Sequence, residues 1–382
     1  MAVDLGGNVM PKRKHFPWIY LVLITGVIVG LVTCSLSRKE QAGPGDTHLR
    51  DEGPLFLIWA DGKNGFMDHT GKVIINPQFD EAYLFSDGLA RVRIGDWDKG
   101  KWGYIDRTGA FVINPEFDGA GDFSDGLAPV KTCSLWGGKC KYGYIDTTGK
   151  MVIKMVINPQ FDYFWHFSDG LARVSINGKN GYIDRTGAYV INPQFDWAGD
   201  FSDGLAVVSI NHKWGFIDQT GAYVINLQFD YARPFSDGLA RVRIGNSETG
   251  KWGYLDHTGA YVINPQFDEA SDFSDGLAAV SIGGLWGFID HIGLYVINPQ
   301  FDRAFGFSDG LAPVRIGNSE TGKWGYIDHT GSYVINPQFD TASGFSDGLA
   351  VMSIGNWRKG KWGYIDRTGK VMWLTLERRP GS

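Results

Sequence analysis

The segment FSDGLARVRIGNSETGKWGYLDHTGAYVINPQFD, residues 235–268, contains three short strings that recur in the same order along most of the chain. The string F-S-D-G-L-A occurs eight times, beginning at Phe85, Phe123, Phe167, Phe201, Phe235, Phe273, Phe307 and Phe345. The Gly of the second string, W-G-Y-L-D and its variants, recurs at Gly65, Gly103, Gly143, Gly181, Gly215, Gly253, Gly287, Gly325 and Gly363. The third string, V-I-N-P-Q-F-D, follows these glycines with small changes up to the eighth. This regularity indicates a tandem array, so fold and function are argued unit by unit.

Each unit is predicted to contain three β-strands. Residues 89–94 alternate between outward and inward positions with the period of two expected of a strand. A hairpin leads to a second strand at 101–106, and the D-x-T-G turn at 106–109 leads to a third at 111–113. Pro115 is expected to end the third strand, because proline cannot donate a ladder hydrogen bond.

A tryptophan precedes the repeated Gly in six of the units. The six are Trp102, Trp214, Trp252, Trp286, Trp324 and Trp362. Large rings at equivalent positions favour packing between units, with ligand stacking as the alternative. A mid-strand Gly weakens a strand unless another group needs the space, so we expect a ring or a neighbouring backbone to lie over it.

These strings resemble the WG-repeat family, also called the KWG repeat. The match is carried by Lys251-Trp252-Gly253-Tyr254, by Lys323-Trp324-Gly325-Tyr326 and by the two flanking strings, and it covers about Pro54 to Leu376. The resemblance implies a bacterial, all-β repeat array that mediates binding, and it implies neither catalysis nor a cofactor. The sequence departs from the pattern where Asn64, Tyr142 and Asn180 replace Trp and where Leu227 replaces Pro. We expect these units to pack more loosely.

The fold class predicted is all-β, an array of about nine three-stranded antiparallel units over residues 54–376, followed by a tail at 377–382. An open, solenoid-like or superhelical arrangement is favoured, and a closed β-propeller is the alternative. The chain starts on a first strand and ends on a third, whereas many propellers divide one blade between the two termini. Nothing in the sequence indicates such a division.

The N-terminal residues 1–37 are predicted to form a transmembrane or signal helix. Lys12, Arg13 and Lys14 precede an uncharged run over 16–37, which is long enough to cross a bilayer. The basic cluster places the array outside the cytoplasm, at the bacterial cell membrane, joined by a flexible linker at 38–53. Alternatively Leu31-Val32-Thr33-Cys34 resembles a lipobox, in which case Cys34 carries the lipid.

Composition excludes several classes of protein. The 382 residues carry a net charge of −6, which argues against a nucleic-acid partner held by phosphate contacts. Aromatic residues make up 14% of the chain and Gly 53 positions, a combination that is not typical of disorder. Collagen is excluded because glycine does not recur at every third residue.

No catalytic constellation, metal site or cofactor site is predicted. Gly306-Phe307-Ser308-Asp309-Gly310 matches G-x-S-x-G, but a strand rather than a helix follows, and most units lack the first Gly. Four histidines, His69, His257, His291 and His329, fall in D-x-T-G turns of separate units, too far apart to share a metal. We therefore expect a protein that is not an enzyme.

Binding residues are sought where the repeat varies. Within F-D-x-A-x-x-F-S-D, aromatic residues and arginine gather in three consecutive units, and these types are enriched in binding hot spots. The candidates are Tyr163, Phe164, Trp165, His166, Trp197, Tyr231 and Arg233. A protein partner is the leading hypothesis, a carbohydrate or cell-wall ligand is the alternative, and local packing would explain the same residues.

The last prediction is a disulfide between Cys133 and Cys140. They are the only cysteines of the array, and they flank one hairpin that contains Gly137-Gly138. Facing positions of an antiparallel hairpin lie within disulfide reach. The bond requires an oxidising compartment, which agrees with the predicted export.

Overall fold

The computed structural model describes residues 53–133, 140–153, 161–355 and 360–375, without the side chains of 161–164. The predicted N-terminal segment, nearly all of the linker and the C-terminal tail lie outside these residues. The described residues form strands, turns and loops, so the all-β prediction is confirmed. None of them belongs to a helix long and apolar enough to cross a membrane.

The strands form nine antiparallel sheets, called blades 1 to 9. Blades 1 to 3 contain β1 (Phe56–Ala60), β2 (Lys63–Met67), β3 (Val73–Phe79); β4 (Glu81–Ala82), β5 (Ala90–Ile94), β6 (Lys101–Ile105), β7 (Phe111–Phe117); and β8 (Gly119–Ala120), β9 (Leu127–Cys133), β10 (Cys140–Asp146), β11 (Met151–Ile153). Blades 4 to 6 contain β12 (Phe161–Ser168), β13 (Leu171–Ile176), β14 (Lys179–Ile183), β15 (Tyr189–Phe195); β16 (Trp197–Ala198), β17 (Leu205–Ile210), β18 (Lys213–Asp218), β19 (Tyr223–Phe229); and β20 (Tyr231–Ser236), β21 (Leu239–Ile244), β22 (Lys251–Leu255), β23 (Tyr261–Phe267). Blades 7 to 9 contain β24 (Glu269–Ala270), β25 (Ala278–Ile282), β26 (Leu285–Ile289), β27 (Tyr295–Phe301); β28 (Arg303–Ala304), β29 (Ala312–Ile316), β30 (Lys323–Ile327), β31 (Tyr333–Phe339); and β32 (Thr341–Ser346), β33 (Leu349–Ile354), β34 (Lys361–Asp366), β35 (Val371–Thr375).

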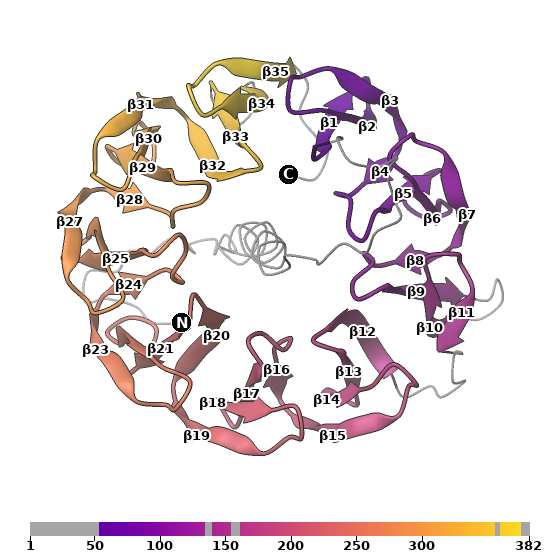
Figure 1. Ribbon diagram of the computed structural model, residues 1–382, viewed down its shortest axis with the longest axis horizontal. Coiled ribbons are helices and arrows are strands. Elements are labelled where there is room, and N and C mark those ends of the chain that lie inside the picture. The colour runs from indigo at the N-terminus through magenta and orange to yellow at the C-terminus, as the bar shows by residue number, and fades with distance from the viewer. Residues whose placement is uncertain (1–52, 134–139, 154–160, 356–359, 376–382) are drawn as a thin grey trace, which may run out of the picture. The chain divides into compact units, whose positions relative to one another are not determined.

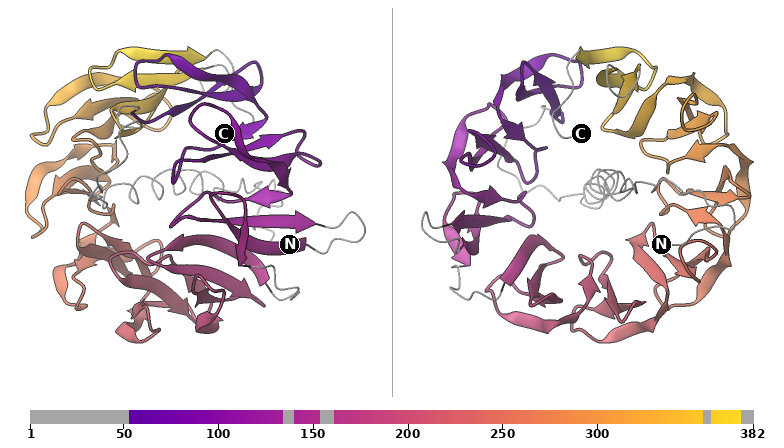
Figure 2. Two further views of the ribbon diagram at one scale, coloured as in Figure 1. Left: turned by 45° about the vertical axis from the view of Figure 1, so that its right-hand side comes forward. Right: turned by 180° about the vertical axis from the view of Figure 1, so that it is seen from behind.

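Within residues 53–375 the nine blades stand around a closed ring, so the preference for an open array was wrong (Figures 1 and 2). Blade 9 packs directly on blade 1, where Phe56, Ile58, Met67 and Leu349 form a buried cluster. The ring of Phe56 lies edge-on to Tyr364, with the ring centroids 5.8 Å apart. Whole blades therefore meet at this contact, here called the seam, and no blade needs to be divided between the termini.

Eight of the nine sheets have four strands, one more than predicted. The additional strand is the innermost one and arises from the F-D-x-A string, as in β4, where Glu81 and Ala82 pair with Arg93 and Val92. It is only two residues long in several blades, too short for a period-two pattern to reveal it. Blade 1 has three strands among the described residues.

The repeated S-D-G-L is a two-residue hairpin turn. Asp87 and Gly88 have φ values of 49° and 81°, and Ser86 and Leu89 exchange backbone hydrogen bonds across them. Two consecutive positive φ angles define a type I′ turn, which Asp-Gly adopts readily and whose twist suits the flanking strands. The predicted Asp-Gly turn is confirmed.

The Gly after Trp is required by a neighbouring backbone, one of the two possibilities that the sequence left open. In blade 6, a Cβ on Gly253 would lie 2.5 Å from the carbonyl oxygen of Ile263 and 2.6 Å from the nitrogen of Pro265. The register shifts here, so the outermost strand bulges over the Gly. The strand also continues through its Pro, as β7 does through Pro115, contrary to the prediction. An outermost edge strand tolerates the missing N–H because no further strand pairs with it.

Each hydrophobic core lies between two blades rather than within one. Leu205, Val207 and Phe216 of blade 5, for example, pack against Phe235 and Val242 of blade 6. Because a strand's side chains alternate between its two faces, each blade contributes one face to the core before it and one to the core after it. This arrangement buries apolar area only when blades stand next to one another.

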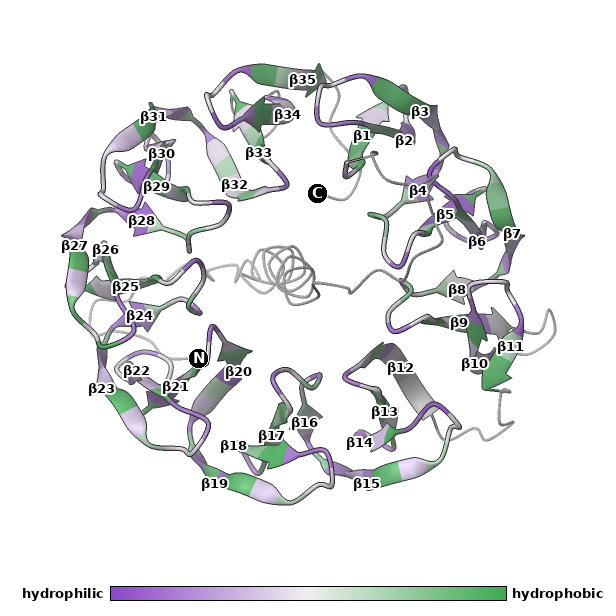
Figure 3. Ribbon diagram, in the orientation of Figure 1, coloured by the Kyte–Doolittle hydropathy of each residue, from purple (hydrophilic) through white to green (hydrophobic). Residues whose placement is uncertain are grey.

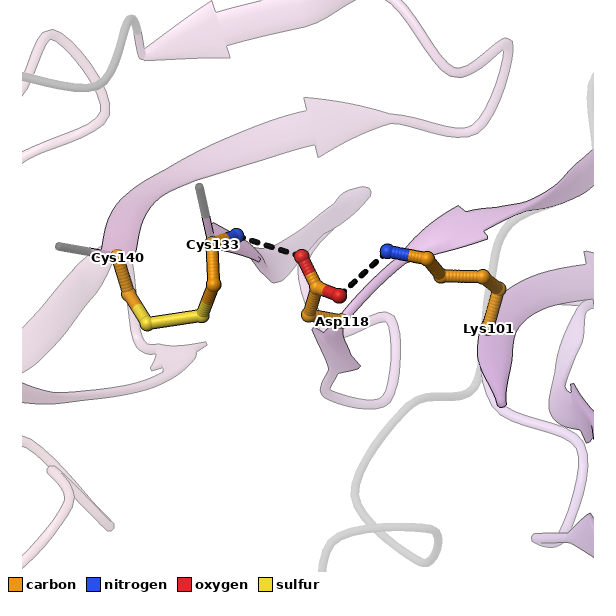
Figure 4. Close-up of a disulfide and its surroundings, with 4 residues drawn as sticks. All are labelled: Lys101, Asp118, Cys133 and Cys140. Atoms are coloured by element: carbon orange, nitrogen blue, oxygen red, sulfur yellow. Dashed lines mark hydrogen bonds and ion pairs between the residues drawn. A yellow bond between two sulfur atoms is a disulfide. The ribbon is translucent and has the colours of Figure 1, made fainter. Parts of the chain in front are cut away.

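A Lys–Asp contact fixes the passage from one blade to the next. The Nζ of Lys101 in β6 binds Oδ1 of Asp118, and Oδ2 of Asp118 accepts a hydrogen bond of 2.5 Å from the backbone N–H of Cys133 (Figure 4). Cys133 and Cys140 are a directly opposed pair of β9 and β10, and their sulfur atoms are joined in a disulfide. The same contact joins blades 6 and 7, where hydrogen bonds from the Lys251 side chain and the Gly283 backbone N–H lower the pKa of the Asp268 carboxyl.

Two of the departures from the repeat pack differently from expectation. Asn64 and Asn180 are buried, and the amide of Asn64 donates to the carbonyl oxygens of Phe79 and Asp80 at 3.3 and 3.1 Å. The amide of Asn180 makes the same bonds to Phe195 and Asp196. A side-chain amide thus replaces ring packing with hydrogen bonds to the backbone of the outermost strand.

Candidate binding surface

Antiparallel strand order gives the ring two different faces. The S-D-G-L turns join the first and second strands of a four-stranded blade, and the D-x-T-G turns join the third and fourth. Because the first and third strands run in the same direction, both turns lie on one face, here called the turn face. The hairpins between the second and third strands of a four-stranded blade, such as residues 245–250, lie on the other, here called the hairpin face. These hairpins vary in length from blade to blade, whereas the turns do not.

On the turn face the repeated polar residues bind the next blade. The hydroxyl of Ser236 donates to the carbonyl of Phe273 at 2.8 Å. The carboxylate of Asp237 accepts from the N–H of Gly276 at 3.2 Å. Equivalent Ser and Asp residues repeat these bonds in most blades, including Ser308 with Phe345. Ser308 is therefore a turn residue that links blades 8 and 9.

Three of the four turn-face histidines are stacked on phenylalanines. His257, His291 and His329 lie nearly parallel to Phe235, Phe273 and Phe307, with ring centroids 4.1 to 4.5 Å apart. The prediction that they are simply exposed turn residues was incomplete, since each ring covers a core residue. The described residues contain no group of three potential metal ligands.

The hairpin face carries the variation. In each four-stranded blade the first variable residue of F-D-x-A pairs across the innermost two strands with one residue, and the eight pairs differ in chemistry. The pairs are Glu81 and Arg93, Gly119 and Lys131, Tyr163 and Ser175, Trp197 and Ser209, Tyr231 and Arg243, Glu269 and Ser281, Arg303 and Arg315, and Thr341 and Ser353. We call these the rim pairs.

Four aromatic residues of blades 5 and 6 form a continuous group, here called the aromatic quartet: Trp197, Trp214, Tyr231 and Trp252. Trp197 and Trp214 lie 4.9 Å apart between ring centroids, on either side of Ser209 across the sheet. Trp214 lies 4.7 Å from Tyr231, which in turn lies 5.8 Å from Trp252. Trp197 is 37% exposed and the other three are partly buried. The quartet extends from blade 5 to blade 6, which stand next to each other in the ring (Figure 1).

The structure places four of the predicted binding residues in two neighbouring groups, which Arg173 connects because its guanidinium also lies 5.8 Å from the Trp197 ring. Trp197 and Tyr231 belong to the quartet, joined by Trp214, which the sequence assigned to packing. Trp165 and His166 form the second, adjoining group: the guanidinium of Arg173 is 3.9 Å above the Trp165 ring, and Nε2 of His166 is 3.4 Å from Asp200.

The structure says less about the other three predicted binding residues, Tyr163, Phe164 and Arg233. The side chains of Tyr163 and Phe164 lie outside the described part, although their backbone pairs with Ser175 and Val174 in β12 and β13. The Nε of Arg233 is buried and has no hydrogen-bond partner. Whether any of the seven binds a ligand stays a prediction.

Sequence reasoning missed the ion pairs between consecutive blades. The Nε of Arg91 lies 2.7 Å from Oδ1 of Asp122, and that of Arg241 lies 2.6 Å from Asp272. Arg173 and Asp200 form a longer pair at 3.9 Å. The signal was present in the sequence, because D-F-S-D-G with the additional Asp occurs only in the unit that follows L-A-R.

The outermost strands carry a different apolar surface, the outer belt, made of two adjacent residues in each of six blades. They are Phe111 and Val112, Tyr189 and Val190, Tyr223 and Val224, Tyr261 and Val262, Tyr295 and Val296, and Tyr333 and Val334, each 38 to 46% exposed. Figure 3 shows hydrophobic segments along these strands, as in β7 and β19. The outer belt is nearly the same in these six blades, unlike the quartet.

Comparison with known proteins supports the repeat assignment. The sequence model of the WG-containing repeat matches residues 65–96, 102–136, 142–179, 181–214, 214–247, 252–286, 286–319 and 324–356, which is most of the chain. A comparison with curated proteins finds no match.

Among solved structures, one described as a eukaryotic initiation factor has a TM-score of 0.61 at 12% identity. It covers 85% of this chain and 96% of its own. BamB from Moraxella catarrhalis has a TM-score of 0.40 at 14% identity, covering 69% of this chain and 91% of its own. The first similarity concerns the fold alone.

Proposed function

The chain belongs to the WG-containing repeat family, and from this premise we propose that it is a non-catalytic scaffold that binds a protein partner through its hairpin face. The observation that carries the proposal is the aromatic quartet. Two indoles and a tyrosine ring meet across a blade boundary, and Trp197 stays more than one-third exposed. Buried packing would not require a large ring at the rim, and the equivalent rim positions of five other blades hold Gly, Glu, Arg or Thr, while blade 4 holds Tyr163.

A protein ligand is favoured over a carbohydrate by the orientation of the rings. The planes of Trp197 and Trp214 are inclined by 47°, and those of Trp214 and Tyr231 by 44°. These rings form a ridged apolar surface with an arginine at its margin, since Arg243 lies 5.6 Å above Tyr231. Trp, Tyr and Arg together are the residues that dominate protein interfaces.

The proposed location is the outer side of the cytoplasmic membrane, with the N-terminal segment as a single-pass or lipid anchor. The basic cluster before the uncharged run over 16–37 supports this orientation. The Cys133–Cys140 disulfide also supports it, because such bonds persist in oxidising compartments. A reporter that is active only in the cytoplasm, fused after Ser382, should be inactive.

The experiment that tests binding compares partner capture by the full chain with capture by a Trp197→Ala, Tyr231→Ala variant. Partners enriched by the wild type are identified by mass spectrometry, and one of them is purified for a titration. Removing two hot-spot rings is expected to weaken affinity by about 2 kcal/mol or more, roughly thirtyfold. The circular-dichroism spectrum and the melting temperature should stay close to those of the wild type.

A matched control removes two rings of similar exposure from the outer belt. Tyr295→Ala, Tyr261→Ala changes residues that are 38% and 40% exposed and should leave the affinity unchanged. Equal loss in both variants would indicate nonspecific adhesion, and loss of folding in the first would assign the quartet to packing. Binding of the same surface to a glycan array instead would establish the carbohydrate alternative.

A further inference from the structure

Two rim pairs join complementary polar or charged side chains, whereas one pair places like charges opposite each other. In blade 2, Nε of Arg93 lies 3.3 Å from Oε2 of Glu81. In blade 9, the hydroxyls of Thr341 and Ser353 are hydrogen-bonded at 2.7 Å. In blade 8, however, Arg303 stands directly opposite Arg315. Like charges at directly opposed positions of adjacent strands are destabilising unless another group balances them.

Both guanidinium groups of blade 8 lie over tryptophan rings. The Cζ of Arg303 is 5.2 Å from the ring centre of Trp286 in blade 7, and that of Arg315 is 5.7 Å from Trp324 in its own blade. A stacked guanidinium uses its flat face and keeps its N–H edge for acceptors in its own plane. The buried Nε of Arg315 has no hydrogen-bond partner. The pair therefore has unused donor capacity.

Two carboxylates lie near the pair, and neither neutralises it fully. Glu269 is 3.7 Å from Arg303, but both side chains are about half exposed, so their interaction is weak. Asp302 binds the N–H of Gly317 with Oδ2, at 2.8 Å. Leu285 occupies the place of the Lys that holds the equivalent Asp in other blades. Burial and the nearby charge of Arg303 lower the pKa of Arg315, while Asp302 opposes this effect.

We propose that Arg303 and Arg315 form an oxyanion-binding site on the hairpin face, which receives a carboxylate of the protein partner. The identity of the ligand, a carboxylate of the partner, rests on the proposed function, whereas the site itself rests on the structure alone. Two adjacent arginines bind carboxylate or phosphate oxygens with several charge-assisted hydrogen bonds, and the bound anion would remove the repulsion between them. The partner surface expected is therefore acidic at this position.

The first test uses inorganic sulfate and the full chain in detergent, with chloride as the reference at constant ionic strength. Sulfate should quench or shift the fluorescence of Trp286 and Trp324 and raise the melting temperature, and both effects should saturate in the millimolar range. Sulfate also stabilises proteins generally by exclusion, but that effect grows without saturating. A response no different from chloride would overturn the site.

Arg303→Glu reproduces the Glu–Arg pair of blade 2 and should fold at least as well as the wild type. It should increase the half-saturating sulfate concentration at least about tenfold, because it removes charge-assisted hydrogen bonds. If Arg303→Glu fails to fold, Arg303→Thr replaces it in the test, because blade 9 carries Thr341 at the equivalent position. The matched control is Lys131→Gln, which removes the single cation of the blade 3 rim pair, and its sulfate response should match the wild type. A retained response in both Arg303 variants would refute the proposal.

A second arm identifies the source of the oxyanion. A hexaglutamate peptide and a purified partner should each compete with sulfate, and the competition should disappear in Arg303→Glu. Competition by inorganic phosphate but not by the peptide or the partner would assign the site to a free anion and contradict the proposed carboxylate. Failure of partner capture with a normal sulfate response would refute the proposed function and leave the site established.

Discussion

The hydroxyl of Tyr364 donates a hydrogen bond of 2.9 Å to the backbone carbonyl of Leu57, 307 positions earlier in the chain. Equivalent tyrosines elsewhere reach the innermost strand region of the next blade, as Tyr326 does with Ser343 at 2.8 Å. Leu57 has the same register position as Pro129 of blade 3, whose carbonyl accepts from Gly121 of the innermost strand region. At the seam, the Tyr364 hydroxyl therefore bonds the Leu57 carbonyl in place of the backbone N–H that bonds the Pro129 carbonyl in blade 3.

Replacing this hydroxyl should weaken the seam selectively. Tyr364→Phe keeps the ring that contacts Phe56 and removes one hydrogen bond, so the free energy of unfolding should fall by about 1 kcal/mol. Hydrogen exchange should increase most in β1, β34 and β35, because they border the seam. Tyr326→Phe, which removes the equivalent bond inside the ring, is the control and should not accelerate exchange in β1. Unchanged exchange in β1 for Tyr364→Phe would show that the hydroxyl does not hold the ring closed.

Two glycines with different surroundings test the bulge. Gly253→Ala should destabilise the protein by about 2–4 kcal/mol, because the new Cβ meets backbone atoms of Ile263 and Pro265 that cannot move independently. Gly306→Ala should change stability by no more than about 0.5 kcal/mol, since its nearest atoms lie 3.9 Å away. Denaturant unfolding measures both. Equal effects would mean that the outermost strand does not bulge over Gly253.

The ion pairs between blades should couple energetically. In a double-mutant cycle, Arg241→Ala and Asp272→Ala should interact by about 1–3 kcal/mol, because both side chains are largely buried and also bonded. The more exposed pair of Arg303 and Glu269 should give less than about 0.5 kcal/mol. A coupling near zero for the first pair would remove it from the contacts that hold blades 6 and 7 together.

Acid should destabilise the array through its D-x-T-G turns. In Asp256, hydrogen bonds from the Thr258 hydroxyl and from backbone N–H groups lower the pKa of the carboxyl. Because the folded pKa lies below the unfolded value of about 3.9, the stabilisation is fully present above that value. It is lost as the pH falls through the folded pKa.

Melting temperature should therefore be level near neutral pH and fall below about pH 4. Thr258→Val should reduce this acid dependence, since it removes the largest cause of the shift. Ile292→Thr, which supplies blade 7 with the hydroxyl that its turn lacks, should increase it. The opposite order of these two variants would contradict the assigned cause.

The disulfide should stabilise the long hairpin of blade 3. Cys133→Ser, Cys140→Ser is expected to lower the free energy of unfolding by about 2 kcal/mol. A reductant should lower the melting temperature of the wild type and have no effect on the double variant. Mass spectrometry of non-reduced peptides checks the bond directly, and free thiols at both positions in exported protein would refute it.

The sequence was sufficient to predict the elements that every unit repeats. Asp-Gly appears in each F-S-D-G-L-A because the turn needs two positive φ angles, and the Gly after Trp reflects a close backbone approach. Both requirements are local, so a single unit reveals them. Ring closure depends instead on the angle between blades, which accumulates over the whole array and leaves no mark on any one unit. The innermost strand was missed for a related reason, because two residues such as Glu81 and Ala82 are too few to show a period.

The candidate surface was only partly predictable. Trp197 and Tyr231 stand out because they break the repeat, whereas Trp214 obeys it and was assigned to packing, although it is the ring that joins them. Arg303 and Arg315 stand twelve positions apart in sequence, and only the register of β28 and β29 makes them a pair. Comparing equivalent positions across blades would have exposed this exception once the pairing was known.

Because many blades contact the next one through the same Tyr, Ser and Asp hydrogen bonds, the ring resembles a head-to-tail polymer whose units are joined covalently. Nothing in one contact specifies which molecule supplies the following blade. Blade 1 of another copy offers Tyr364 the same carbonyl as blade 1 of its own chain, and the tether between the ends decides the competition through effective concentration. A chain opened at the seam would thus present two matching ends, and concentrated protein opened in this way would join end to end instead of closing.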